Sequence, residues 1–149
     1  MIAEYGNKLF NAFKKNGKIK LSIKEEIEGF ERLVISKKEI FSIKMVDKSE
    51  LQELYDINFF TEWSGRTYGC CITSDDMIYF QEVDSATFAE EHGFQMVERG
   101  VYEKKVPIEE CSHFGYVKHD YLNDEIIRKE NISIAEFKQL FSENVIDLM

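Results

Sequence analysis

The residue types that most directly suggest chemistry are the cysteines and histidines, of which the chain has three each. Cys111 and His113 lie two residues apart, His119 follows, and Cys70 and Cys71 are adjacent. Zinc usually takes about four nitrogen or sulfur ligands, often from cysteines paired at short spacings. Adjacent cysteines in a strand point to opposite faces, so Cys70 and Cys71 cannot easily bind one ion. The pattern favours structural cysteines and predicts no metal site. A catalytic pairing of Cys111 with His113 or His119 stays open as an alternative.

A second pattern is the E-x-K element at residues 103–105, on a predicted strand, with Asp75, Asp76 and Asp84 before it. The set resembles the PD-(D/E)xK metal-dependent nucleases, in which an Asp and the Glu bind a divalent metal and the Lys orients or activates water. The resemblance implies a nuclease. However, the Pro-Asp element of that family is missing, and an acidic chain lacks the clustered basic residues that phosphate contacts need. A solvated strand face is the favoured interpretation.

Pairs of neighbouring carboxylates could in principle act as acid and base. They are Glu90-Glu91, Glu109-Glu110 and Asp124-Glu125. Acid–base pairs need a contrast in burial that separates their pKa values. These pairs lie beside short-helix or loop signals, where carboxylates are expected to interact with the dipole of a helix N-terminus or simply to be solvated. Nucleotide-binding, zinc-protease and serine-hydrolase motifs are absent. The sequence therefore predicts no catalytic residue and no cofactor.

Two aromatic segments are candidate partner-binding surfaces. Residues 58–67, which are expected to form a loop, combine Phe59, Phe60 and Trp63 with Arg66. Trp, Tyr and Arg are frequent interface hot spots. The same aromatic side chains can instead fold into the core. The second segment, residues 113–121, interleaves aromatic and polar groups. Its candidates are Phe114, Tyr116, Asp120 and Tyr121.

Helical spacing predicts the elements at both ends of the chain. Residues 2–15 place Ile2, Leu9, Phe10 and Phe13 on one side of a helix that stops at Asn16-Gly17. Another helix is expected after Ser49, which forms a capping box with Gln52, and residues 108–131 are expected to be helix plus loop. A last helix follows Ser133, which caps with Glu136. Its apolar stripe is Ile134, Phe137, Phe141, Val145 and Leu148.

Alternation predicts strands between these helices. In residues 18–24 the apolar side chains Ile19, Leu21 and Ile23 alternate with a polar face. The polar face carries Lys18, Lys20 and Lys24, which suit a sheet edge or, alternatively, an anion site. Hairpins are expected at residues 30–46, 68–83 and 94–106, with a short helix after Asp84-Ser85. The predicted fold is a single α+β domain, residues 1–149. Its mainly antiparallel sheet of hairpins carries an N-terminal and a C-terminal amphipathic helix.

Charge and length restrict the class of protein. The chain has 149 residues and a formal charge of −9, with +3 in residues 1–50 and −12 in residues 51–149. Such acidity opposes nucleic-acid binding and attracts basic partners. No apolar run is long enough for a membrane span, no signal peptide is visible, and three cysteines form no disulfide framework. A cytoplasmic location is expected.

The combination favours a small acidic binding or inhibitor protein that captures a protein partner, which is expected to be basic. Bacterial immunity proteins and phage-encoded inhibitors share this physical character. Opposite charge would speed association, and aromatic anchors would hold the complex. Two alternatives stay open: a small enzyme whose site is assembled from dispersed residues, and a small-molecule sensor or structural subunit.

Overall fold

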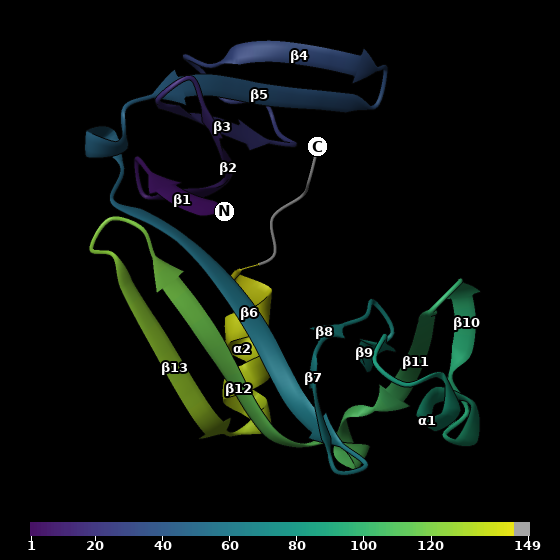
Figure 1. The fold of residues 1–149 in the computed structure, drawn as a ribbon. Coiled ribbons are helices and arrows are strands. Elements are labelled where there is room, and N and C mark those ends of the chain that lie inside the picture. Colours follow the sequence, from purple (N-terminus) through teal and green to yellow (C-terminus); the bar gives the residue numbers. More distant parts are fainter. Residues whose placement is uncertain (145–149) are drawn as a thin grey trace. The chain divides into compact units, whose positions relative to one another are not determined.

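Antiparallel β-strands make up most of the chain (Figure 1). The structure, a computed structural model, describes residues 1–144. These residues form two compact units, one of residues 1–57, 118–127 and 144, the other of residues 58–117 and 128–143. Three long strands contribute to both units: β6 (Glu53–Trp63), β12 (Ser112–Asp120) and β13 (Glu125–Ile132). Within residues 1–144, the helices are all too short or too polar to cross a membrane.

The first unit is a meander of strands joined by short turns. Its strands are β1 (Ile2–Tyr5), β2 (Lys8–Lys15), β3 (Lys18–Ile23), β4 (Glu31–Ser36), β5 (Glu39–Val46) and the start of β6. They hydrogen-bond in the order β6-β1-β2-β3-β5-β4, and each neighbouring pair is antiparallel. The predicted inward side chains Ile19, Leu21 and Ile23 are buried. They share an apolar core with Ala3, Phe10, Ala12, Val46, Leu51 and Leu54.

Left-handed turn residues decide the fold of the first 20 residues. Gly6 and Asn7 have φ values of 57° and 63°, and Asn16 and Gly17 have 52° and 77°. Two consecutive residues with positive φ form the tight turn that matches the twist of a β-hairpin. The predicted helix over residues 2–15 is therefore wrong, because the turn at Gly6-Asn7 divides it into β1 and β2.

The second unit combines a small sheet with part of the larger one. The small sheet has the order β10 (Gln95–Glu98), β11 (Val101–Pro107), β9 (Met77–Glu82) and β8 (Cys71–Ile72). Helix α1 (Ala86–Glu91) connects β9 to β10, and the Ser85 hydroxyl accepts the N–H of Phe88 as its cap, as predicted for this segment. Strand β7 (Arg66–Gly69) pairs with β6, and β12 lies between β6 and β13.

Helix α2 (Ile134–Glu143) covers the β6 and β12 part of this unit (Figure 1). The Ser133 hydroxyl accepts the N–H of Glu136, which confirms the predicted helix start. Phe137 is fully buried, with its ring centroid 5.5 Å from Phe59 and 4.7 Å from Phe114. Residues Val145 and Leu148 of the predicted stripe lie outside the described residues.

The predicted α+β class with two amphipathic helices packed on a sheet is wrong, because the described residues are mostly strand and their two α-helices are short. Residues 58–67, expected as a loop, form the β6–β7 hairpin around Ser64-Gly65, and residues 112–132 form the β12–β13 hairpin. The helix expected after Ser49 is a three-residue 3-10 turn (Lys48–Glu50), in which the Asp47 N–H donates to Glu50.

Strand β3 also differs from the expectation of an edge. It lies between β2 and β5, so its lysines do not protect an exposed sheet edge from pairing with another strand. The open end of this part of the sheet is β4, whose six residues are all exposed.

Candidate functional site

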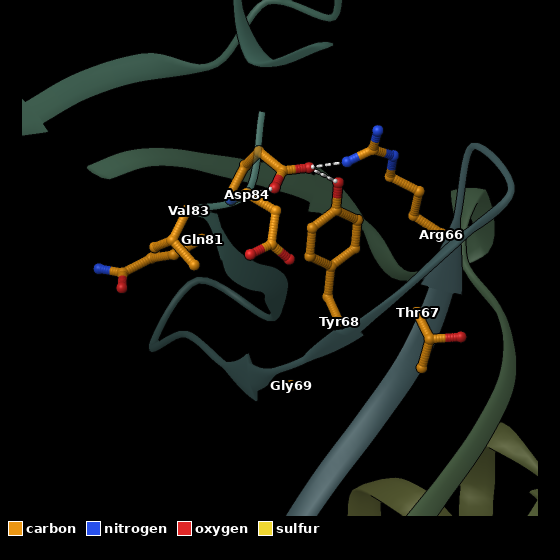
Figure 2. A pocket seen from close by; sticks show the side chains of 8 residues that line it. Arg66, Thr67, Tyr68, Gly69, Gln81, Val83 and Asp84 are labelled. Carbon is orange, nitrogen blue, oxygen red and sulfur yellow. Dashed lines mark hydrogen bonds and ion pairs between the residues drawn. The ribbon is translucent and has the colours of Figure 1, made fainter. Parts of the chain in front are cut away.

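A pocket of about 440 Å³ opens in the second unit, between β7 and the end of β9. Figure 2 shows the side chains that line it. They are Arg66, Thr67, Tyr68 and Gly69 from β7, with Gln81, Glu82, Val83 and Asp84 from β9 and the residues that follow it. This volume lies within the range of pockets that bind small molecules or single side chains.

A buried carboxylate organises the pocket. Glu82 is only 2% exposed, and it accepts hydrogen bonds from Arg66 Nη1 at 2.7 Å and from the Tyr68 hydroxyl at 2.8 Å (Figure 2). Its other oxygen accepts the N–H of Asp84 at 2.9 Å. Burial alone would raise the pKa of Glu82, but these hydrogen bonds and the Arg66 charge hold it below its usual value. Glu82 is therefore an ionised, fully paired group.

Strand periodicity places Arg66 and Tyr68 together. They are two residues apart on β7 and so share one face, which turns toward Glu82. The Tyr68 ring stacks on Phe80 at 4.7 Å, and the Arg66 guanidinium carbon lies 3.9 Å from the centre of the Phe88 ring. Aromatic packing thus fixes both donors before any ligand arrives.

The charges of the pocket do not cancel. Arg66 is neutralised by Glu82, and burial together with the hydrogen bond to Glu82 raises the pKa of Tyr68 far above its usual value, so the phenol stays protonated. The Asp84 side chain is exposed and has no hydrogen-bonding or ionic partner among residues 1–144. The lining therefore keeps one uncompensated negative charge, at Asp84.

The predicted aromatic anchors mostly lie inside the second unit. Phe59 and Phe114 are buried against Phe137. Phe60 is half-buried under Arg128, whose guanidinium carbon lies 4.6 Å from the centre of the ring. The remaining two are also half-buried: Trp63 lies beside Phe80 and Phe94, and Tyr116 lies edge-on to Phe59. Of the candidate residues in the first segment, Arg66 alone lines the pocket.

Asp120 and Tyr121 lie in the first unit. The Asp120 carboxylate accepts the side chain and N–H of Asn123 and the N–H of Leu122, and these bonds lower its pKa. The Tyr121 hydroxyl donates to Asp56, and its ring stacks on His119 at 4.0 Å. Both side chains, at the end of β12 and in the turn that follows it, thus have partners within the first unit.

The lysines of the predicted anion site and the residues that line the pocket belong to different units. All three belong to the first unit, on β3 or directly after it. Lys18 pairs loosely with Asp47 at 3.9 Å, Lys20 is half-buried, and Lys24 is exposed.

The cysteines and histidines are dispersed as well. Residues 1–144 contain no group of three or more His, Cys, Asp or Glu side chains that could hold a metal ion. Burial raises the pKa of the Cys70 thiol to about 12 and that of Cys111 to about 11. His113 Nδ1 contacts Asn131, and His119 lies near Asp124.

The residues that resemble a nuclease are not assembled into one site either. Glu103 accepts the hydroxyl of Tyr79, and Lys105 pairs with Asp75 at 3.3 Å. Lys104 lies over the Trp63 ring at 5.4 Å. Of the set, only Asp84 lines the pocket.

The comparison with protein families identifies the group to which the sequence belongs. A family model matches residues 1–121, which is most of the chain and includes every residue of the pocket. The chain belongs to the family described as uncharacterised conserved protein UCP033725. No curated protein and no solved structure matches it. The UCP033725 model thus spans the pocket without assigning an activity to it.

Sequence reasoning missed the centre of the pocket. Arg66 was a candidate as an exposed hot spot, but its partners Tyr68 and Glu82 were not. Two features of the sequence could have indicated the pairing. Glu82 ends an apolar strand, where an unpaired buried carboxylate would be costly. Arg66 and Tyr68 lie two residues apart, so a strand would place two hydrogen-bond donors on one face.

Proposed function

We propose that this protein is a binding or inhibitor protein that captures a basic protein partner through its second unit. The distribution of charge carries the proposal. Residues 58–117 and 128–143 contain 7 Lys+Arg and 14 Asp+Glu, a net charge of −7 out of the −9 of the chain. Most of the acidity that predicted a basic partner therefore belongs to one unit.

Much of this charge is available to a partner. Within residues 1–144, six exposed carboxylates of the unit have no hydrogen bond or ion pair of their own. They are Asp84, Glu90, Glu91, Glu98, Glu109 and Glu110. Four of the six lie between β9 and the β10–β11 turn. Unpaired charges of one sign raise the rate of encounter with an oppositely charged protein, and they disfavour acidic partners.

Exposed apolar side chains accompany these carboxylates. Val83, Met96 and Val97 are 62%, 64% and 48% exposed. Burial of these side chains against a partner would supply the apolar contact area that the sequence pattern assigned to the aromatic residues. The flexible methionine side chain can adapt its shape to a partner. The proposal thus keeps the basic partner that the acidity of the sequence predicted but assigns the anchors to these aliphatic residues.

The proposal includes a cytoplasmic location. Cys70, Cys71 and Cys111 are free thiols, which is the usual state of cysteines in a reducing compartment.

A capture experiment with matched charge-reversal variants tests the proposal. The tagged full chain is incubated with lysate of its own host, once as the wild type and once as a second-unit variant. The second-unit variant carries Glu90→Lys, Glu91→Lys and Glu98→Lys. The control carries Glu28→Lys, Glu31→Lys and Glu39→Lys. These three glutamates are exposed in the first unit, and their side chains have no hydrogen bond or ion pair within residues 1–144. Both variants have the same formal charge of −3, calculated from the −9 of the wild type.

We expect one basic protein to be enriched by the wild type and by the control and lost with the second-unit variant. Its retention should also fall as salt is raised, because exposed charges are screened within about 10 Å at 0.1 M salt. Equal loss in both variants, or an acidic partner, would refute the proposal.

A further inference from the structure

The pocket beside Glu82 has a chemistry of its own. Asp84 contributes a carboxylate without a partner among the described residues, and Tyr68 contributes an aromatic wall that Phe80 supports from behind. Figure 2 shows the Asp84 side chain pointing toward the pocket, whereas that of Thr67 points away from Tyr68. From this geometry we infer that the pocket receives a primary ammonium group, as carried by a lysine side chain of the partner.

The charge of the lining selects a cation. Arg66 does not repel it strongly, because the 2.7 Å ion pair with Glu82 neutralises the guanidinium. The lining keeps the negative charge of Asp84, so an anionic ligand would meet net repulsion. A metal ion is disfavoured because it needs several ligands from Asp, Glu, His or Cys, and no such group of three occurs in residues 1–144.

The shape of the lining favours lysine over arginine. A guanidinium gains much of its affinity by stacking on an aromatic face and by bidentate hydrogen bonding. The nearby face of Phe88 is already occupied by Arg66, at 3.9 Å. An ammonium is compact, pairs with a single carboxylate, and carries an aliphatic stem that Val83 and the Tyr68 ring can contact.

This inference rests on the proposed capture of a basic protein and names the group that is recognised. It is tested on the isolated full chain, without the partner. The probe is the peptide acetyl-Ala-Lys-Ala-amide, titrated into the ¹⁵N-labelled protein and followed by NMR. The comparison probes carry Nε-acetyl-lysine or arginine at the central position.

We expect amide shifts at residues 66–69 and 81–84 with the lysine peptide, and none with its acetylated form. Asp84→Asn should weaken binding about fivefold or more, since it removes the only unpaired charge of the lining. The matched control is Glu109→Gln, which removes one exposed, unpaired carboxylate of the same unit outside the pocket and should change affinity less than about twofold.

Three results would overturn the inference: shifts spread over the acidic surface, equal effects of the two substitutions, or tighter binding of the arginine peptide. The two proposals fail separately. If capture from lysate succeeds while the lysine peptide does not bind, only the pocket assignment is wrong. If the peptide binds at the pocket but no basic protein is captured, the proposed function is wrong.

Discussion

The ring of Phe60 fills the space that a side chain at position 115 would occupy. A Cβ atom built on Gly115 would lie 2.4 Å from Phe60 Cζ and 2.4 Å from the carbonyl oxygen of Lys129. Real Cβ atoms essentially never approach other atoms so closely. Glycine is therefore required here by close packing, although its φ is not in the left-handed region.

Gly115→Ala should destabilise the protein by about 2–3 kcal/mol, because neither the buried ring edge nor a backbone oxygen can move aside freely. Urea unfolding measures the change. Gly69→Ala is the matched control, since its Cβ would meet only the Phe59 oxygen at 3.9 Å, an ordinary contact. A loss of stability that is equal in the two variants would show that Phe60 does not pack on Gly115.

Two buried serines of the first unit should respond in opposite directions to the same substitution. Ser22 and Ser42 are both almost fully buried, but only Ser42 is satisfied: its hydroxyl accepts the N–H of Ile27 and donates to the carbonyl of Glu25. Among the described residues 1–144, the Ser22 hydroxyl has no hydrogen-bond partner.

Ser22→Ala should therefore stabilise the protein by about 1 kcal/mol, because it removes an unsatisfied buried group, and Ser42→Ala should destabilise it by about 1–2 kcal/mol. The two variants delete the same atom, so each is the control for the other. Thermal unfolding of both reports the signs. Destabilisation by both would mean that Ser22 finds a partner in solution.

The sequence predicted strands best where alternation was strict. Residues 18–24 were identified because one buried face demands a period of two. The hairpins over residues 30–46 and 94–106 were identified from β-forming residues on either side of a turn. It misled at residues 2–15, where Ile2, Leu9 and Phe10 fit helical and hairpin spacing equally well. The deciding feature was the Gly6-Asn7 turn, which helical periodicity ignores.

The candidate site was less accessible to sequence reasoning, because it depends on long-range pairing. Arg66 and Glu82 come from strands of two different sheets, and no local pattern states which strands will lie together. The prediction of a helix within residues 108–131 was wrong for a related reason. Strand β13 is an edge strand in which all residues but Ile132 are exposed, including the adjacent Ile126 and Ile127, so no apolar alternation marked it.

Thiol reactivity separates a structural role of the cysteines from the catalytic alternative. Because burial raises the pKa of Cys70 to about 12 and of Cys111 to about 11, little thiolate exists at pH 8. From the loss of thiolate, iodoacetamide at pH 8 should alkylate native Cys111 on the order of 100-fold, and native Cys70 on the order of 1,000-fold, more slowly than the same cysteines in urea. Labelling should rise with pH as the thiolates form.

Peptide mapping by mass spectrometry assigns the rates to each cysteine. Cys71 is the internal reference, since it is partly exposed and its pKa is also raised. Rapid native labelling of Cys111 alone would contradict the structural interpretation and favour an activated nucleophile.

Glu82 should make stability depend on pH in the acid range. Its pKa is lowered in the folded state, whereas a free glutamate has a pKa of about 4.3. A group with a lowered folded pKa contributes stability above the unfolded pKa, and that contribution is lost as pH falls through the folded pKa.

Glu82→Gln should cost about 2–3 kcal/mol of stability at pH 7, a value reduced from that of a fully buried pair because Arg66 is 40% exposed. The difference between wild type and variant should shrink below about pH 4, because protonation removes the same charge from the wild type. Denaturant unfolding at pH 3, 4, 5 and 7 measures this difference, with Glu109→Gln as the control whose profile should run parallel to the wild type. A Glu82→Gln penalty that stays constant across this range would mean that the carboxylate is not held ionised by Arg66, Tyr68 and the Asp84 N–H, and the electrostatic description of the pocket would have to be abandoned.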